Sequence, residues 1–113
     1  MFKILTGKKG ERKAAEYLTK KGYRIKECNM RAPFGEVDII ASDGTVLVFV
    51  EVKTRSHSQF GTGADAVTKD KQRKLIKSAQ YYCKIKNIMP LCRFDVISID
   101  AGVITHIENA FTA

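Results

Sequence analysis

Apolar residues recur along this chain with two different periods, and these periods divide it into seven elements. Apolar residues spaced by three and four predict two helices, one near the start of the chain and one about two-thirds of the way along it. The other apolar segments are short and rich in β-branched residues, which is typical of strands. The predicted elements are a helix over 8–21, strands over 23–30, 36–41 and 45–54, a helix over 68–86, and strands over 93–100 and 103–108.

Capping and turn residues set the boundaries of these elements. Thr6 is available to cap the first helix, and Gly22 lies where a glycine commonly ends one. Pro90 prevents the second helix from continuing. Residues 55–63 have the composition of a loop.

The order α-β-β-β-α-β-β predicts a single α/β domain over residues 1–113. The first three strands can form an antiparallel meander. The long helix then makes a crossover, so the fourth strand should lie parallel to the third. We therefore expect a mixed five-stranded sheet flanked by helices.

A hairpin joins the second and third predicted strands. Asp43 and Gly44 favour a type I′ turn with both residues at its centre. In that register Ser42 faces Thr45, and Asp38 faces Phe49. The same register sets Glu36 opposite Glu51, so it fixes which side chains share a face.

Acidic and basic residues directly follow the most apolar segment of this hairpin, Val46–Val50. Because side chains alternate across a strand, Asp38, Glu51 and Lys53 should project from one face. Two carboxylates that project from one face of a hairpin can bind one Mg²⁺ or Mn²⁺ between them. A lysine beside them can act on water or phosphate. The alternative is the solvated face of an amphipathic hairpin, where Glu–Lys pairs are common.

Two further features favour a site for phosphodiester chemistry. Helical spacing puts Glu11 on the apolar stripe of the first helix, so its carboxylate should point toward the sheet. The chain also carries 20 Lys and Arg against 12 Asp and Glu, a net charge of +8, which suits an acidic partner such as nucleic acid.

The chain resembles the YraN-like (UPF0102) family, which is similar to archaeal Holliday-junction resolvases of the restriction-endonuclease-like superfamily. That superfamily has the motif PD-(D/E)-x-K. The resemblance covers nearly the whole chain and is carried by Gly10-Glu11-x-x-Ala14, Gly35-Glu36-Val37-Asp38-Ile39-Ile40, Phe49-Val50-Glu51-Val52-Lys53-Thr54-Arg55 and Arg93-Phe94-Asp95-Val96.

This resemblance implies a role for each matching residue. Asp38 and Glu51 match the acidic residues of the motif and Lys53 its lysine, while Val37 replaces the motif proline. Glu11 matches a helix glutamate that helps to hold metal in resolvase-like members. Relatives place a further polar residue early in the long helix, where the apolar stripe favours Gln72 over Lys71.

Basic residues cluster around the predicted loop and the long helix. Those expected to contact phosphate are Arg55, Lys71, Arg73 and Lys74. Such contacts give an affinity that falls as salt rises. For any one of these residues, the alternative is a solvated helix face. No regular alternation of aromatic residues with these basic residues marks a stacking platform for a single strand.

The sequence therefore predicts a nucleic-acid-binding protein that acts as a Mg²⁺- or Mn²⁺-dependent endonuclease, with DNA favoured over RNA. Branched DNA and a homodimer are expectations by analogy. The alternatives are a non-catalytic nucleic-acid-binding module and a protein-interaction domain. Three cysteines without a C-x-x-C pair, and no apolar run long enough to span a membrane, favour the reducing cytoplasm.

Overall fold

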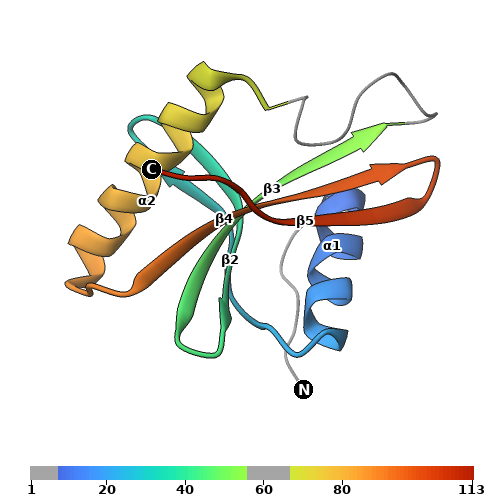
Figure 1. Ribbon diagram of the computed structural model, residues 1–113, viewed down its shortest axis with the longest axis horizontal. Coiled ribbons are helices and arrows are strands. Elements are labelled where there is room, and N and C mark those ends of the chain that lie inside the picture. The colour runs from blue at the N-terminus through green and yellow to red at the C-terminus, as the bar shows by residue number, and fades with distance from the viewer. Residues whose placement is uncertain (1–7, 56–66) are drawn as a thin grey trace.

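The computed structural model describes residues 8–55 and 67–113, and it confirms the predicted order of two helices and five strands. Thr6 and most of the predicted loop, residues 56–63, lie outside the described residues. The elements are α1 (Lys9–Lys20), β1 (Arg24–Ala32), β2 (Gly35–Asp43), β3 (Val46–Arg55), α2 (Lys69–Lys86), β4 (Leu91–Asp100) and β5 (Val103–Phe111) (Figure 1).

The ends of α1 follow from local backbone chemistry. The helix begins after Lys8, whose side chain makes no capping hydrogen bond. Gly22 follows the helix with a φ of 100°, and the Tyr23 N–H donates to the Leu18 carbonyl at 2.9 Å. The predicted glycine stop is therefore confirmed. Within the described chain, neither helix combines the length and apolar character needed to cross a membrane.

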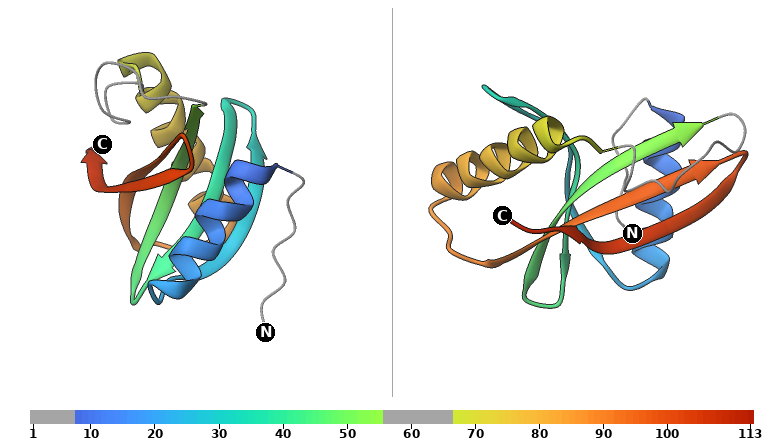
Figure 2. Two further views of the ribbon diagram at one scale, coloured as in Figure 1. Left: turned by 90° about the vertical axis from the view of Figure 1, so that its right-hand side faces the viewer. Right: turned by 45° about the horizontal axis from the view of Figure 1, so that its top comes forward.

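The five strands form one mixed sheet in the order β1-β2-β3-β4-β5. β3 and β4 are parallel, as the crossover through α2 predicted, and the other neighbours are antiparallel. The two helices cover opposite faces of the sheet, with α1 in front and α2 behind in the left view of Figure 2.

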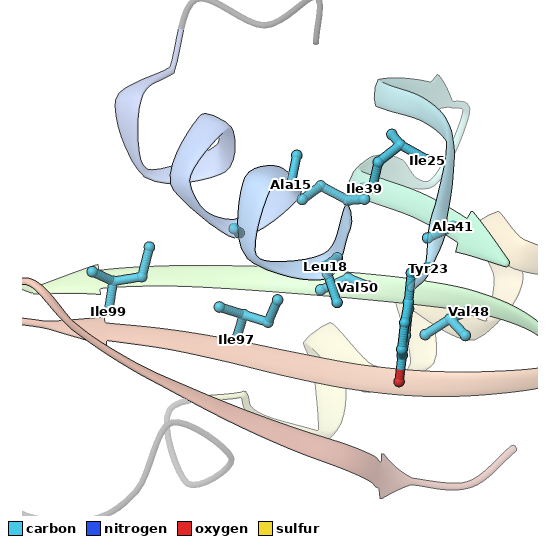
Figure 3. Packing of buried hydrophobic residues seen from close by; sticks show 11 residues of the cluster. Ala15, Leu18, Tyr23, Ile25, Ile39, Ala41, Val48, Val50, Ile97 and Ile99 are labelled. Carbon is cyan, nitrogen blue, oxygen red and sulfur yellow. The ribbon is translucent and has the colours of Figure 1, made fainter. Parts of the chain in front are cut away.

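Each face of the sheet has its own hydrophobic core. On one face, Ala15 and Leu18 of α1 pack against a group that includes Val50 and Ile97 (Figure 3). On the other, α2 packs against a group that includes Phe49. Successive residues of β3 serve the two cores in turn, so this strand is buried on both sides.

The turn between β2 and β3 differs from the prediction by one residue. Asp43 pairs with Val46, so the turn residues are Gly44 and Thr45. Gly44 has a φ of 60°, which fits glycine in the first central position of a type II′ turn. Asp43 stays in the strand, where its carboxylate accepts a hydrogen bond from Arg93 at 3.0 Å.

This turn changes the register of the whole hairpin. Ser42 pairs with Leu47 rather than Thr45, and Phe49 pairs with Ile40 rather than Asp38. The predicted pairs are therefore wrong by two residues. A shift of two residues keeps every β3 side chain on its predicted face, because the side-chain period of a strand is also two.

β2 and β3 separate beyond the pair formed by Ile39 and Val50, the last in their ladder. Val37 packs in the core under α2, whereas Ile39 packs in the core under α1. Residues two apart in a regular strand share a face, so the alternation of β2 breaks at Asp38. The Val52 N–H donates to the Asp38 carboxylate at 2.8 Å instead of continuing the β2–β3 ladder.

A closed ionic network lies on the α1 face of β4. Asp95 is fully buried and accepts hydrogen bonds from Arg93 Nε at 2.9 Å and the Asn109 N–H at 3.0 Å. His106 Nε2 lies 2.7 Å from the same carboxylate, and its side chain is 1% exposed. Sequence reasoning assigned His106 no role, because the residues that surround it are far away in the chain.

Replacing Asp95 with alanine should destabilise the protein by about 3–5 kcal/mol, because Arg93 and His106 would lose the buried carboxylate that joins them and Arg93 would keep only Asp43. Urea unfolding followed by circular dichroism measures this change. The matched control is Asp70→Ala, which removes exposed ion pairs to Arg73 and Lys74 and should cost less than about 1 kcal/mol. Equal losses in both variants would contradict a structural role for the network.

Candidate metal centre

Three carboxylates meet where β2 begins. Glu11 comes from the first turn of α1 and is only 6% exposed, as its place on the apolar stripe predicted. Glu36 and Asp38 come from β2. One carboxylate oxygen from each residue lies within 4.8 Å of the other two, which is close enough for a shared cation.

Asn29 of β1 joins two of these carboxylates. Its side-chain amide donates to Glu11 and, at 3.2 Å, to Glu36. Its φ of 55° is uncommon within a strand, and asparagine is one of the few residues that tolerate it. Sequence reasoning missed Asn29, although an asparagine between strand residues was a weak signal of such a distortion.

A second group of charges surrounds Glu51, which is 3% exposed on the α2 face of β3. Its Oε2 lies 2.6 Å from the Lys71 Nζ and 3.5 Å from the Lys53 Nζ. Burial alone would lower the pKa of Lys71, but the ion pair with Glu51 outweighs it and raises the pKa. Lys71 is therefore held as a cation beside Glu51, and the Lys53 Nζ lies close to the same carboxylate.

Asp38 lies between the two groups. Burial and then repulsion by Glu51 raise the pKa of Asp38 to about 8, with a smaller contribution from Glu11, although the hydrogen bond from the Val52 N–H opposes the rise. At neutral pH this carboxyl therefore keeps its proton. The main cause is burial of the carboxyl, and the nearby negative charge of Glu51 adds to it.

Lys8 balances part of that charge from the N-terminal side. Its Nζ lies 3.0 Å from Glu36 and 3.6 Å from Glu11. The hydrogen bond from Lys8 lowers the pKa of Glu36. Sequence reasoning named Glu36 only as the residue opposite Glu51, whereas the structure includes it among the three converging carboxylates.

The structure reverses the order of the two candidates in α2. The Gln72 side-chain amide donates to the Val67 carbonyl at 3.0 Å, at the start of the helix, and is not brought to the carboxylates. Lys71 reaches Glu51 instead. Thr68 caps the helix through the Lys71 N–H, and this fixes which residue of the first turn faces the sheet.

The other predicted phosphate contacts lie in different surroundings. Arg55 Nε is 2.5 Å from Asp100, and this pair ties the end of β3 to the end of β4. Arg73 and Lys74 are exposed near Asp70, at 3.7 and 3.2 Å. Arg55 is thus engaged within the fold, while the helix residues remain at the surface.

The donor set at Asp38 fits a hard divalent cation. Carboxylate oxygens are the ligands that Mg²⁺ and Mn²⁺ prefer. Repulsion by Glu51 and Glu11, which adds to burial in raising the pKa of Asp38, is the part of the shift that a bound cation would relieve. Asp38, Glu11 and Glu36 could hold such an ion, and Glu51 could join them once a lysine moves away.

Known sequences match this chain over nearly its full length. The model of Uncharacterised protein family UPF0102 matches residues 10–99. This chain belongs to that family. A UPF0102 protein of Thermodesulfovibrio yellowstonii is 51% identical over 112 residues, which is 98% of this chain and 99% of the relative.

Other UPF0102 relatives show similar agreement. One from Symbiobacterium thermophilum is 48% identical over 113 residues, covering 95% of this chain and 96% of its own. One from Persephonella marina is 46% identical over 112 residues, covering 98% and 97%. The family resemblance inferred from the motifs is confirmed. The residues of this UPF0102 protein that the family model matches include Glu11, Asp38, Glu51 and Lys53.

Asp38→Asn should stabilise the metal-free protein at pH 8 by about 1–2 kcal/mol. The pKa of Asp38 is higher in the folded chain than in the unfolded one, so its contribution to stability declines as pH rises from about 4 toward 8. Asparagine stays neutral and can still accept from Val52. Urea unfolding in EDTA at pH 5 and pH 8 measures the effect.

The control for this prediction is Glu16→Gln, which neutralises an exposed carboxylate on α1. Its effect should be small and similar at the two pH values. If Asp38→Asn destabilises the protein at pH 8, or if its effect does not grow with pH, the raised pKa of Asp38 is refuted.

Proposed function

We propose that this UPF0102 protein is a metal-dependent endonuclease that hydrolyses phosphodiester bonds in nucleic acid. The observation that carries the proposal is the position of Asp38, between Glu11 and Glu36 on one side and Glu51 with Lys53 on the other. Structural ion pairs are normally closed by opposite charges. Here Asp38 lies between two groups of charged residues, and burial and repulsion by Glu51 raise its pKa.

The carboxylates would hold the ion through Asp38, which both groups share. Glu11 and Glu36 would support it from the α1 side, and Glu51 from the α2 side. When bound, Mg²⁺ or Mn²⁺ supplies Lewis-acid polarisation of the phosphate and makes water more acidic. Asn29 would keep Glu11 and Glu36 oriented through its amide.

Lys53 and Lys71 would stabilise the negative charge of the phosphate. Lys53 is 28% exposed at its side chain, so its ammonium can contact both Glu51 and a ligand in the open part of the site. Lys71 is 47% exposed and can leave Glu51 for a phosphate oxygen. Positive groups placed beside a phosphate stabilise the negative charge that grows in the transition state.

The charge of the chain supports an anionic polymer as substrate. A net charge of +8 favours association with nucleic acid, and we retain DNA over RNA and a structured or branched DNA as the favoured substrate. A homodimer would present two sites to two strands. The three cysteines are free in the described chain, which suits the reducing cytoplasm.

One observation favours a second candidate, a nucleic-acid-binding module without cleavage. Glu51 is already paired with two lysines, and a site locked in this state would bind phosphate while Glu51 stays unavailable to a cation. Salt-dependent binding of nucleic acid without any metal binding would support it. Binding to neither nucleic acid nor metal would favour a protein-interaction domain.

The endonuclease proposal predicts that Mn²⁺ binds the protein and that Glu51→Gln and Asp38→Asn each weaken this binding at least tenfold at pH 8. Each substitution removes a negative charge and replaces one of the two carboxylate oxygens with an amide nitrogen that cannot bind the ion. Isothermal titration calorimetry measures the affinity. Glu16→Gln, an exposed carboxylate of α1, is the control and should bind Mn²⁺ like the wild type.

Lys53→Ala should retain Mn²⁺ binding but lower cleavage at least 100-fold, because it loses the charge beside the phosphate. Labelled branched, flapped and single-stranded substrates with Mn²⁺ measure cleavage. Lys20→Ala, an exposed lysine at the end of α1, is the control. The catalytic reading fails if the wild type binds no metal and cuts none of these substrates.

Lys71→Ala should raise the affinity for Mn²⁺ several-fold, since Glu51 would lose its nearest competing cation. The same variant should cleave more slowly than the wild type, because Lys71 would no longer be available for phosphate. Opposite changes in metal binding and cleavage would separate Lys71 from the carboxylate ligands. A loss of metal affinity in Lys71→Ala would contradict its role as a competitor.

A further inference from the structure

A hollow of about 320 Å³ opens directly beside the carboxylates. Glu36 and Glu51 line it on the sheet side, and Lys71 and Lys74 line it on the α2 side. Phe34, from the turn between β1 and β2, lines it as well. An aromatic ring thus borders the same space as two of the carboxylates.

Phe34 also borders a second hollow, of about 450 Å³, on its far side. There its ring meets Tyr81 edge-on, with the ring centroids 6.5 Å apart, and the Lys77 Nζ lies 5.8 Å from its centroid. The turn that carries Phe34 lies beside α2 in Figure 1. Despite these contacts, 43% of Phe34 remains exposed.

The basic residues of α2 that line these two hollows with Phe34 form a row along the helix. The row contains four lysines and one tyrosine, each three or four residues after the one before. Its members are Lys71, Lys74, Lys77, Tyr81 and Lys84. Residues at this spacing lie on one side of a helix. The row extends for about 20 Å at roughly 1.5 Å per residue, away from Glu51. Asp70 is the only acidic residue within α2.

We propose that Phe34 and this lysine row form a binding site for single-stranded nucleic acid, in which an unpaired base stacks on Phe34. The proposal rests on the proposed function and deepens it by naming the substrate class. The lysines would contact successive phosphates, and the strand would lead into the hollow beside Glu51.

The exposed ring is the reason to choose a single strand over a duplex. Base faces are stacked on each other inside a duplex, whereas an unpaired base offers a face to an aromatic side chain. Lysines alone would contact the backbone of either form. A site with both features beside the carboxylates favours cleavage next to an unpaired nucleotide.

Binding of a 12-residue single-stranded DNA containing 2-aminopurine, in EDTA, tests the site without requiring cleavage. Fluorescence anisotropy of an end label gives the affinity, and 2-aminopurine emission reports stacking. Phe34→Ala should bind about 5- to 100-fold more weakly and lose the change in emission. It should bind a blunt duplex of the same sequence within twofold of the wild type.

The controls separate stacking from folding and from general apolar contact. Phe34→Tyr keeps a stacking ring and should bind single strands like the wild type. Met89→Ala removes a fully exposed apolar side chain from the connector after α2 and should have no effect. Lys74→Ala and Lys77→Ala should each reduce the slope of log affinity against log salt by about one. The affinity for an RNA strand of the same sequence, compared with that for the DNA strand, shows whether the site prefers ribose or deoxyribose.

The outcomes distinguish this site from the proposed function. If Phe34→Ala weakens single-strand and duplex binding equally, or weakens neither, the stacking site is refuted even if the wild type cleaves DNA. Absence of single-strand binding by the wild type refutes it too. If Phe34-dependent binding is found but no Mn²⁺ binds and nothing is cut, the endonuclease fails and the single-strand site stands.

Discussion

The burial of β3 on both faces is the constraint on which the candidate site depends. Its apolar side chains alternate between two cores, so each face of the sheet requires a helix. α1 and α2 therefore lie on opposite sides of one strand (Figure 2). Glu11 from one helix and Lys71 from the other approach the same end of the sheet, where Glu51 follows the apolar part of β3. The site lies where the two layers of helix meet the polar end of a buried strand.

The two clusters of buried charge, around Asp95 and around Asp38, differ in the direction in which the pKa of the central aspartate is shifted. Around Asp95, each carboxylate oxygen is bound by donors from Arg93, His106 or the Asn109 backbone, and the low pKa of Asp95 reflects this. Around Asp38, burial and then repulsion by Glu51 raise the pKa instead, although Lys8, Arg31, Lys53 and Lys71 lie beside the neighbouring carboxylates. A closed network stabilises a fold, whereas a buried carboxyl that its neighbours repel favours a ligand.

Much of this arrangement could be predicted from residue patterns, and the errors have physical causes. Glu51 and Lys53 share a face as predicted although the turn was misplaced, because a shift of two residues preserves alternation. Asp38, predicted on the same face, lies where the alternation of β2 breaks. The turn was misplaced because the contact that keeps Asp43 in its strand comes from Arg93, fifty residues away. Lys71 was ranked below Gln72 because helical spacing alone does not fix how the helix is rotated against the sheet.

The sequence by itself determined the elements, their order and the burial of Glu11, since each depends on local periodicity and on the chemistry of caps and turns. Only the tertiary structure decided which charges meet. The break in β2 at Asp38, the reach of Lys71 to Glu51 and the approach of Phe34 to α2 all join residues distant in the chain. Such contacts follow from how layers pack and where strands separate, and no local pattern encodes either.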